Sequence, residues 1–164
     1  MIRLKTALAS TAVVAAMLGA HAAQAATATA TARARIVPAV AVTNIAGSEL
    51  GFATIVTGPT AAKVTVAPNG TRTACGTGLT CVGTTSAARF AVTGETGLTV
   101  GISTTATTAL TSGGNSMSTT LVPSVATMTL AATNQFSVGG ELSVGANQAD
   151  GVYTGTFTVT VDYN

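Results

Sequence analysis

The 164-residue sequence predicts an all-β protein, an antiparallel β-sandwich preceded by a signal peptide. One observation is compositional: 33 threonines and 18 glycines favour strands and turns over helices. Another is the repeated alternation of apolar and polar residues, which is the period of a strand. The third is the series of Gly, Asn, Asp and Pro turn signals between the alternating segments. Because 47% of the residues are hydrophobic and only 7% are charged, the chain is expected to bury a core.

Residues 1–25 are expected to be a secretory signal peptide that is absent from the mature protein. Two cations and an apolar stretch of 13 residues precede a small-residue cleavage site, Ala23-Gln24-Ala25. That stretch is shorter than the roughly 20 apolar residues that span a bilayer, and no later segment is long and apolar enough. The mature chain is therefore expected to lack an integral membrane segment. It would cross the inner membrane and reside in the periplasm, on the outer surface or outside the cell.

The mature N-terminus alternates over a stretch that is longer than one ordinary strand. Its apolar face begins with four alanines, Ala28, Ala30, Ala32 and Ala34. Because Pro38 cannot donate a ladder hydrogen bond, we divide the stretch into an N-terminal extension (26–35) and a first domain strand (36–44). The sandwich domain is therefore expected to occupy residues 36–164. The alternative is that residues 26–32 are simply an unstructured Ala/Thr tail.

Shorter alternating segments follow the first strand in chain order. They lie at residues 50–53, 63–66, 89–92, 98–103 and 127–130. The two longest segments come last, at residues 136–145 and 153–163, and Gly139-Gly140 is expected to mark a bend or a bulge. In the final segment threonines occupy one face, and the other face carries Tyr153, Phe157, Val159, Val161 and Tyr163.

The inward faces of these segments predict the hydrophobic core, because alternate residues of a strand face the same side. The predicted core residues are Phe52, Val64, Val66, Phe90, Val92, Leu98, Val100, Ile102, Met128, Leu130, Phe136, Val138, Leu142, Phe157, Val159 and Val161. A domain of this size is expected to bury roughly two-thirds of the surface of its unfolded chain.

The two cysteines and the charge balance fit a secreted protein without a nucleic-acid partner. Cys75 and Cys81 are expected to form a structural disulfide in an oxidising compartment. Closing so short a loop contributes about 2.4 kcal/mol in the chain-entropy model. The mature chain carries five cations and five anions, so its net charge is zero and no basic patch indicates nucleic-acid binding.

No catalytic, metal-binding or cofactor-binding residues are predicted. The only histidine lies in the signal peptide, which excludes Ser-His-Asp and Cys-His catalysis in the mature chain. No glycine-rich phosphate loop is present. The acidic residues are interpreted as solvated surface groups, and residues 147–151 as a plain Asp-Gly turn rather than a calcium site. The protein is therefore expected to be no enzyme and to need no cofactor.

Several segments resemble a family of bacterial secreted domains known as domain of unknown function 4402. The matching segments are residues 50–52, 64–72, 90–95, 136–142 and 151–163. The resemblance covers nearly the whole mature chain and implies an Ig-like sandwich. It implies no known activity.

The C-terminus is similar to those of chaperone–usher pilins and spore-coat-U-type proteins. The shared features are an alternating final strand, a penultimate aromatic residue, here Tyr163, and a glycine upstream, here Gly151. The resemblance implies a subunit that assembles with copies of itself or related subunits, served by a periplasmic chaperone and an outer-membrane usher. One feature departs from the pattern, because pilin donor strands carry bulky apolar side chains whereas residues 28–34 offer only alanines.

The function expected from these features is a non-enzymatic structural subunit of a cell-surface fibre or coat, which assembles by β-strand addition. The extension 26–35 would be the donor, and the final segment would lie beside an open or weakly closed edge. The assembly residues of that segment would be Gly151, Tyr153, Phe157, Val159, Val161 and Tyr163. The alternative is a self-contained secreted sandwich that binds a surface component. An incomplete sandwich needs a strand from a partner, whereas a complete one folds its own N-terminal strand into the sheet.

Overall fold

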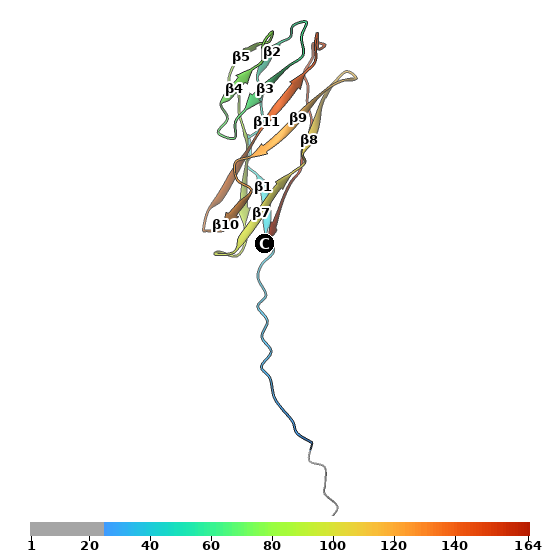
Figure 1. Cartoon of the computed structure of the whole chain (residues 1–164). Coiled ribbons are helices and arrows are strands. Elements are labelled where there is room, and N and C mark those ends of the chain that lie inside the picture. The colour runs from blue at the N-terminus through green and yellow to red at the C-terminus, as the bar shows by residue number, and fades with distance from the viewer. Residues whose placement is uncertain (1–24) are drawn as a thin grey trace, which may run out of the picture. The chain divides into compact units, whose positions relative to one another are not determined.

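The computed structural model describes residues 25–164, so the predicted signal peptide lies outside the described residues except for Ala25. The chain divides into two units, residues 1–35 and 36–164. In the first unit, residues 25–35 form no helix or strand, and their side chains are exposed. Among the described residues, all the strands lie in the second unit and none of the residues is helical (Figure 1).

The second unit confirms the predicted all-β antiparallel sandwich, because every pairing between its strands is antiparallel. Its strands are β1 (Ala41–Asn44), β2 (Thr54–Val56), β3 (Ala62–Val66), β4 (Arg72–Cys75), β5 (Thr80–Val82), β6 (Ala88–Thr93), β7 (Thr99–Thr104), β8 (Thr107–Ser112), β9 (Asn115–Pro123), β10 (Thr127–Thr129), β11 (Asn134–Val144) and β12 (Val159–Tyr163). In Figure 1, β2 and β5 lie at one end of the domain, and β7 and β10 lie toward the end that holds the C-terminus.

The longest strand, β11, organises a seven-stranded sheet. Val138 pairs with Ala88 of β6 and with Pro123 of β9, so these two strands lie on opposite edges of β11. Farther along, Gly140 pairs with Val66 of β3 and with Leu121 of β9. One edge of β11 therefore pairs first with β6 and then with β3, and β3 also pairs with β4. The other edge of β11 pairs with β9, which also pairs with β8.

The glycine pair Gly139-Gly140 lies at this exchange of partners, and the predicted alternative of a bulge is wrong. The β9 ladder runs through both glycines without a register shift, and the β3 ladder begins at Gly140. A Cβ atom at Gly139 would collide with the main chain of Val66 and Ala67. The glycine is therefore explained by the close approach of another backbone, which only a residue without a side chain permits.

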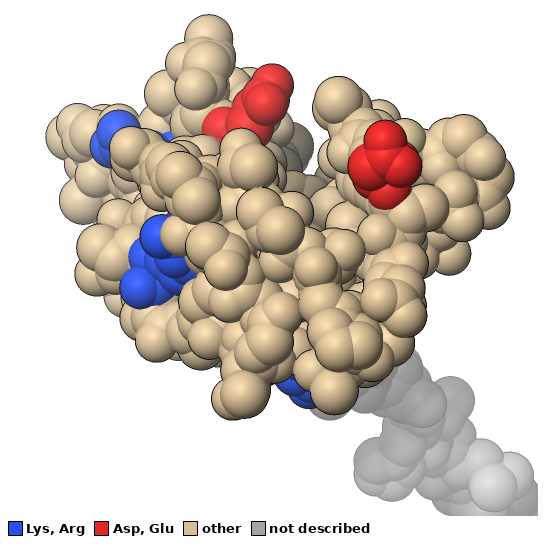
Figure 2. All heavy atoms as spheres, turned by 90° about the horizontal axis from the view of Figure 1, so that it is seen from above, with Lys and Arg blue, Asp and Glu red and all other residues tan. Residues whose placement is uncertain are grey.

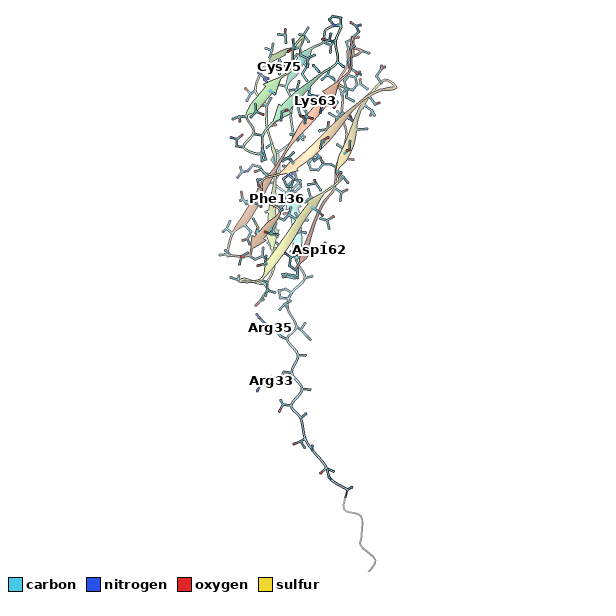
Figure 3. The ribbon with its side chains drawn as sticks, viewed as in Figure 1. Arg33, Arg35, Lys63, Cys75, Phe136 and Asp162 are labelled. Carbon is cyan, nitrogen blue, oxygen red and sulfur yellow. A yellow bond between two sulfur atoms is a disulfide. The ribbon has the colours of Figure 1, made fainter. Side chains whose placement is uncertain are left out.

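A second, three-stranded sheet, β10-β7-β12, faces part of the large sheet, and β2 pairs with β5 separately. One core cluster joins the two sheets, with Phe136 and Val138 from β11 packed together with Ile102 of β7 and Val161 of β12. Phe136 lies inside the domain in Figure 3. A second cluster contains Val64 and Val66 of β3 with Leu142 and Val144 of β11.

Most of the predicted core is buried. Eleven of the sixteen predicted residues are buried, and five others are only partly buried: Phe90, Leu98, Met128, Phe157 and Val159. Four of these five, all except Leu98, pack against the first core cluster from its margin. Among the buried hydrophobic residues, the prediction missed four, namely Ala87, Ala88, Leu121 and Val144.

Two predicted strands are shorter than expected. The first strand covers 41–44 rather than 36–44, because its partner β6 ends at Thr93, opposite Ala41. The final ladder covers 159–163 rather than 153–163. The chain changes sheets there, since Thr154 bridges Thr111 of β8 in the large sheet while Val159 pairs with Thr104 of β7 in the small sheet. A regular ladder cannot continue through that change of partner.

Candidate functional site

An apolar groove of about 1060 Å³ opens over the part of the large sheet that holds the second core cluster. One wall is formed by parts of residues 44–57 and the other by residues 148–157. The floor comes from the large sheet and consists of Ala88, Phe90, Leu110, Met117, Thr119, Leu121, Leu142 and Val144. The groove exists because no strand of the β10-β7-β12 sheet pairs along the space between these two walls.

The floor follows from strand alternation. On β9, Met117, Thr119 and Leu121 line the groove, whereas Val122 is exposed and does not line it. On β11, Leu142 and Val144 line it in the same way. Because successive residues of a strand point to opposite faces of the sheet, the sequence places its apolar residues on the groove side at this point.

The wall formed by residues 148–157 is hydrogen-bonded to the large sheet at alternate residues. Thr154 exchanges two main-chain bonds with Thr111, at 2.8 and 3.1 Å. The carbonyl oxygen of Thr156 accepts a bond from the Thr108 hydroxyl at 2.6 Å, and that of Thr158 accepts one from the Thr105 amide at 3.0 Å. The even-numbered residues therefore face β8 and the loop that precedes it.

The odd-numbered residues of the same wall leave an open edge. The main-chain groups of Tyr153, Gly155 and Phe157 have no hydrogen-bond partner among the described residues. In an extended segment, N–H and C=O groups of neighbouring residues point to opposite sides. By this alternation we expect the unpaired groups to lie on the side of the segment away from β8, where the groove opens. An edge of this kind is a template on which another strand can pair.

Hydrogen bonds between the two walls join them near Gly58 and Gln148. The Asn147 amide donates to the Gly58 carbonyl at 2.8 Å, and the Thr57 hydroxyl donates to the Gln148 carbonyl at 3.3 Å. The Tyr153 hydroxyl stabilises the loop that contains Gln148 and Ala149. It donates a hydrogen bond to the Ala149 carbonyl and accepts one from the Gln148 side-chain amide, each at 2.8 Å. These bonds fix the spacing of the walls at this point without filling the groove.

The groove carries exposed apolar side chains on both walls. Val56 is 56% exposed on one wall and Val152 is 82% exposed on the other. On the floor, the buried hydroxyl of Thr119 has no hydrogen-bond partner, the only such side-chain atom among the described residues. Exposed apolar residues grouped around a concave surface mark interaction sites.

The groove has acidic side chains on its walls and no basic ones. Glu49 lies on one wall and Asp150 on the other, and no Lys or Arg lines it among the described residues. Charged groups are few elsewhere on the domain as well. Figure 2 shows isolated charged side chains on a largely uncharged surface that is hollowed between two lobes. The two carboxylates stand on opposite walls of the groove.

The structure divides the predicted assembly segment in two. Gly151, Tyr153 and Phe157 line the groove. Val159 and Val161 belong to β12 and pack with the core between the sheets. The Tyr163 hydroxyl accepts a hydrogen bond from the Glu95 amide at 2.8 Å and donates one to the Pro38 carbonyl at 3.0 Å.

The predicted donor residues Ala28, Ala30, Ala32 and Ala34 lie in the first unit, where they are exposed and outside any strand. Sequence reasoning missed the groove floor on β8 and β9, although Met117, Thr119 and Leu121 alternate with polar neighbours. That period-2 signal would have found the strand.

The predicted disulfide between Cys75 and Cys81 is present, with an S–S distance of 2.06 Å and a Cα–Cα distance of 6.2 Å. It joins the end of β4 to β5. In Figure 3, Cys75 lies toward one end of the domain and Asp162 toward the other. The disulfide therefore ties together the part of the domain in which the β2–β5 pair lies.

Two further observations bear on chemistry and location. The described residues contain no group of three or more His, Cys, Asp or Glu side chains placed to hold a metal ion. Residues 25–164 also contain no helix that could span a bilayer. The lining of the groove offers apolar surface, and the edge beside it offers main-chain hydrogen-bonding groups. This is the chemistry with which a sheet edge receives an extended peptide.

The model of the family described as Domain of unknown function (DUF4402) matches residues 40–163. This match spans the strands from β1 to β12 and includes both walls of the groove. Among curated proteins and solved structures, none matches the chain.

Proposed function

We propose that this chain, which belongs to the family described as Domain of unknown function (DUF4402), is a structural subunit of a cell-surface fibre or coat that assembles by β-strand addition. It is non-enzymatic in this proposal, and its partners are copies of itself or related subunits. The observation that carries the proposal is an apolar groove bordered by an unpaired sheet edge at Tyr153, Gly155 and Phe157. Main-chain bonds to such an edge supply affinity, and pockets for alternate side chains supply specificity.

The shape of the groove favours an extended peptide over a small molecule. Its volume of about 1060 Å³ lies at the upper limit of small-molecule pockets, which are typically ~300–1000 Å³. It runs along a whole wall segment, residues 148–157, rather than converging on a few polar groups. An added strand would pair with that segment and cover the apolar side chains of Val56 and Val152.

The occupant that we propose is the N-terminal extension, residues 26–35, of a second copy. Ten residues in extended conformation reach roughly 33 Å, enough to follow a sandwich sheet. The alanine face of the extension continues into Ile36, a large apolar side chain that is 97% exposed. Ile36 supplies the bulky anchor that the four alanines lack, because burying its side chain contributes about 1.5–3 kcal/mol.

Charge fixes the face that the extension presents to the groove. With the alanines inward, Arg33 and Arg35 point outward, where Glu49 and Asp150 stand on the walls. A shift of one residue would turn both arginines onto the apolar floor. Burying an unpaired guanidinium there is strongly unfavourable. The extension can therefore bind only with its alanine face on the groove floor. The acidic side chains of the walls attract its arginine face.

A subunit with an open apolar groove needs protection before it assembles. We propose that the chain crosses the inner membrane, and that a periplasmic chaperone covers the groove until an outer-membrane usher exchanges it for the extension of the next subunit. The pilin-like C-terminus, with its penultimate Tyr163, supports this route. The open edge beside Gly155 supports it too, since an unprotected edge promotes aggregation.

Two substitutions on one strand test the proposal. Met117→Arg places a charge on the groove floor, and Val122→Arg places the same charge on the exposed face of β9. We expect Met117→Arg to abolish assembly, because an apolar strand cannot cover an unpaired charge. Val122→Arg should assemble as the unaltered protein does. Electron microscopy of the cell surface and analytical ultracentrifugation of purified protein measure assembly, and thermal unfolding shows that each variant is folded.

Equal assembly of a folded Met117→Arg variant and the unaltered protein would contradict the proposal. So would an unaltered protein that is monomeric under all conditions. In either case the self-contained sandwich that binds a surface component becomes the better account.

A further inference from the structure

A second concavity, of about 790 Å³, lies over the outer face of the large sheet. It is bordered by the β3–β4 turn at 68–71, by the β5–β6 loop at 83–87, and by Arg72, Arg89 and Ser137. Arg89 and Ser137 pair across β6 and β11. On β6, Ala88 and Phe90 face the groove, so Arg89 between them faces the opposite side of the sheet. This concavity is therefore separate from the groove.

Both arginines of the concavity are held by neutral acceptors. The Arg72 guanidinium donates to the carbonyl oxygens of Cys81, at 3.2 Å, and Gly83, at 3.4 Å. The Arg89 guanidinium donates to the Gln135 side-chain oxygen at 2.8 Å. The disulfide fixes Cys81 relative to Cys75, on the same strand as Arg72. Each guanidinium is thus positioned while its positive charge is left without a carboxylate partner.

The rest of the lining is polar and carries no negative charge. No Asp or Glu lines the concavity among the described residues, whereas hydroxyl and amide groups do. The main-chain amides of Thr84 and Thr85 have no hydrogen-bond partner in the part of the chain that the structure describes. The concavity therefore presents positive charge together with hydrogen-bonding groups.

We infer that this concavity binds a carboxylate-bearing saccharide, of the kind in which each sugar ring carries one carboxylate. Guanidinium groups pair with carboxylates through two parallel hydrogen bonds. The hydroxyl and amide groups of the lining match sugar hydroxyls. Residues 36–164 carry only three cations against five anions. Two guanidinium groups on such a domain fit the sparse charge of a saccharide with one carboxylate per ring, whereas proteins that bind a nucleic-acid backbone neutralise many phosphates. The open face suits a polymer that passes across the surface.

The test is ligand-observed saturation-transfer NMR with trigalacturonic acid, which reports binding to the protein whether it is monomeric or assembled. We expect saturating binding of the acid and none of its methyl ester, which lacks the charge. Arg72→Gln and Arg89→Gln should each weaken binding roughly tenfold, because a hydrogen bond to a charged group contributes on that scale. Lys63→Gln is the matched control, since Lys63 is an exposed cation that pairs with Glu141 outside the concavity. Circular dichroism confirms the fold of each variant.

Equal binding of the acid and its methyl ester would overturn the inference, as would no binding of the acid. Unchanged affinity in folded Arg72→Gln and Arg89→Gln variants would overturn the location. Competition by sulfate with the same affinity at equal ionic strength would show a general anion site and overturn the saccharide assignment. None of these outcomes depends on strand addition, because the groove lies on the other face of the sheet.

Discussion

Deletion of residues 26–35 is expected to produce a folded monomer that no longer assembles. The domain should survive, because every strand and both core clusters lie within residues 36–164. Assembly should be lost, because the deletion removes the whole extended segment that would pair with the edge at Tyr153, Gly155 and Phe157, and the retained Ile36 cannot form a strand by itself. Surface electron microscopy and analytical ultracentrifugation measure the loss. Surface polymers formed by the truncated protein would refute the donor role.

A pair of single substitutions tests whether assembly requires a particular face of the donor strand or only the presence of the extension. Ala32→Arg puts a charge on the face that we place against the groove floor, whereas Thr31→Arg puts it on the outward face. We expect the first to prevent assembly and the second to permit it, since adjacent residues of a strand point to opposite sides. Equal behaviour of the two variants would show that the extension does not bind as a strand of fixed register.

Phe136→Ala is expected to lower the free energy of unfolding by about 3–5 kcal/mol, the range for removing a buried phenylalanine. Phe136 is 3% exposed and stacks on Phe90, with ring centroids 5.4 Å apart. Phe90 in turn meets Phe157 edge-on at 6.0 Å, and both line the groove. Loss of Phe136 therefore leaves a cavity beneath one end of the groove.

Denaturant unfolding of the monomeric 36–164 domain measures this effect without interference from assembly. Phe157→Ala is the control, and it should cost less because Phe157 is only partly buried. A loss below about 1 kcal/mol for Phe136→Ala would show that the core is packed otherwise. A larger loss for Phe157→Ala than for Phe136→Ala would mean that the groove is closed in the monomer.

The strands that sequence alternation predicted best are those with one buried and one solvated face. In β7, Val100 and Ile102 alternate with residues that are more exposed, and β3 does the same with Val64 and Val66. Such strands can be recognised from the sequence, because burial of one face selects apolar residues at every second position. The disulfide was also predictable, since two cysteines in a chain that is predicted to be secreted have one possible pairing within it.

The strands that escaped prediction lack that contrast. β8 reads Thr-Thr-Ala-Leu-Thr-Ser, and none of its residues is fully buried. β2 and β5 have three residues each, too few to show a period. Their pairing depends on the loops that bring them together, and this long-range information is not contained in local alternation.

The site was predictable only in part, for a related reason. The alternation around Phe157 indicated a segment suited to strand pairing, but it continued unbroken into β12. No feature of the local sequence indicates where the C-terminal segment stops pairing with Thr111 of β8 and begins to pair with Thr104 of β7. That change of sheet places Tyr153 and Gly155 on the groove while it buries Val161 in the core. The groove itself arises from how far one sheet covers another, which is a property of the assembled fold.

The most direct test of strand addition is to find where the extension binds in the assembled protein. A photoreactive phenylalanine analogue at position 31, in place of Thr31, lies on the outward face of the proposed donor and therefore beside the groove walls. After irradiation of the assembled protein, denaturing electrophoresis separates cross-linked pairs, and mass spectrometry identifies the joined peptides. We predict a covalent dimer in which position 31 of one copy is joined to residues 44–57 or 148–157 of another. Cross-links confined to one chain, or joined to the outer face around Arg89, would contradict it.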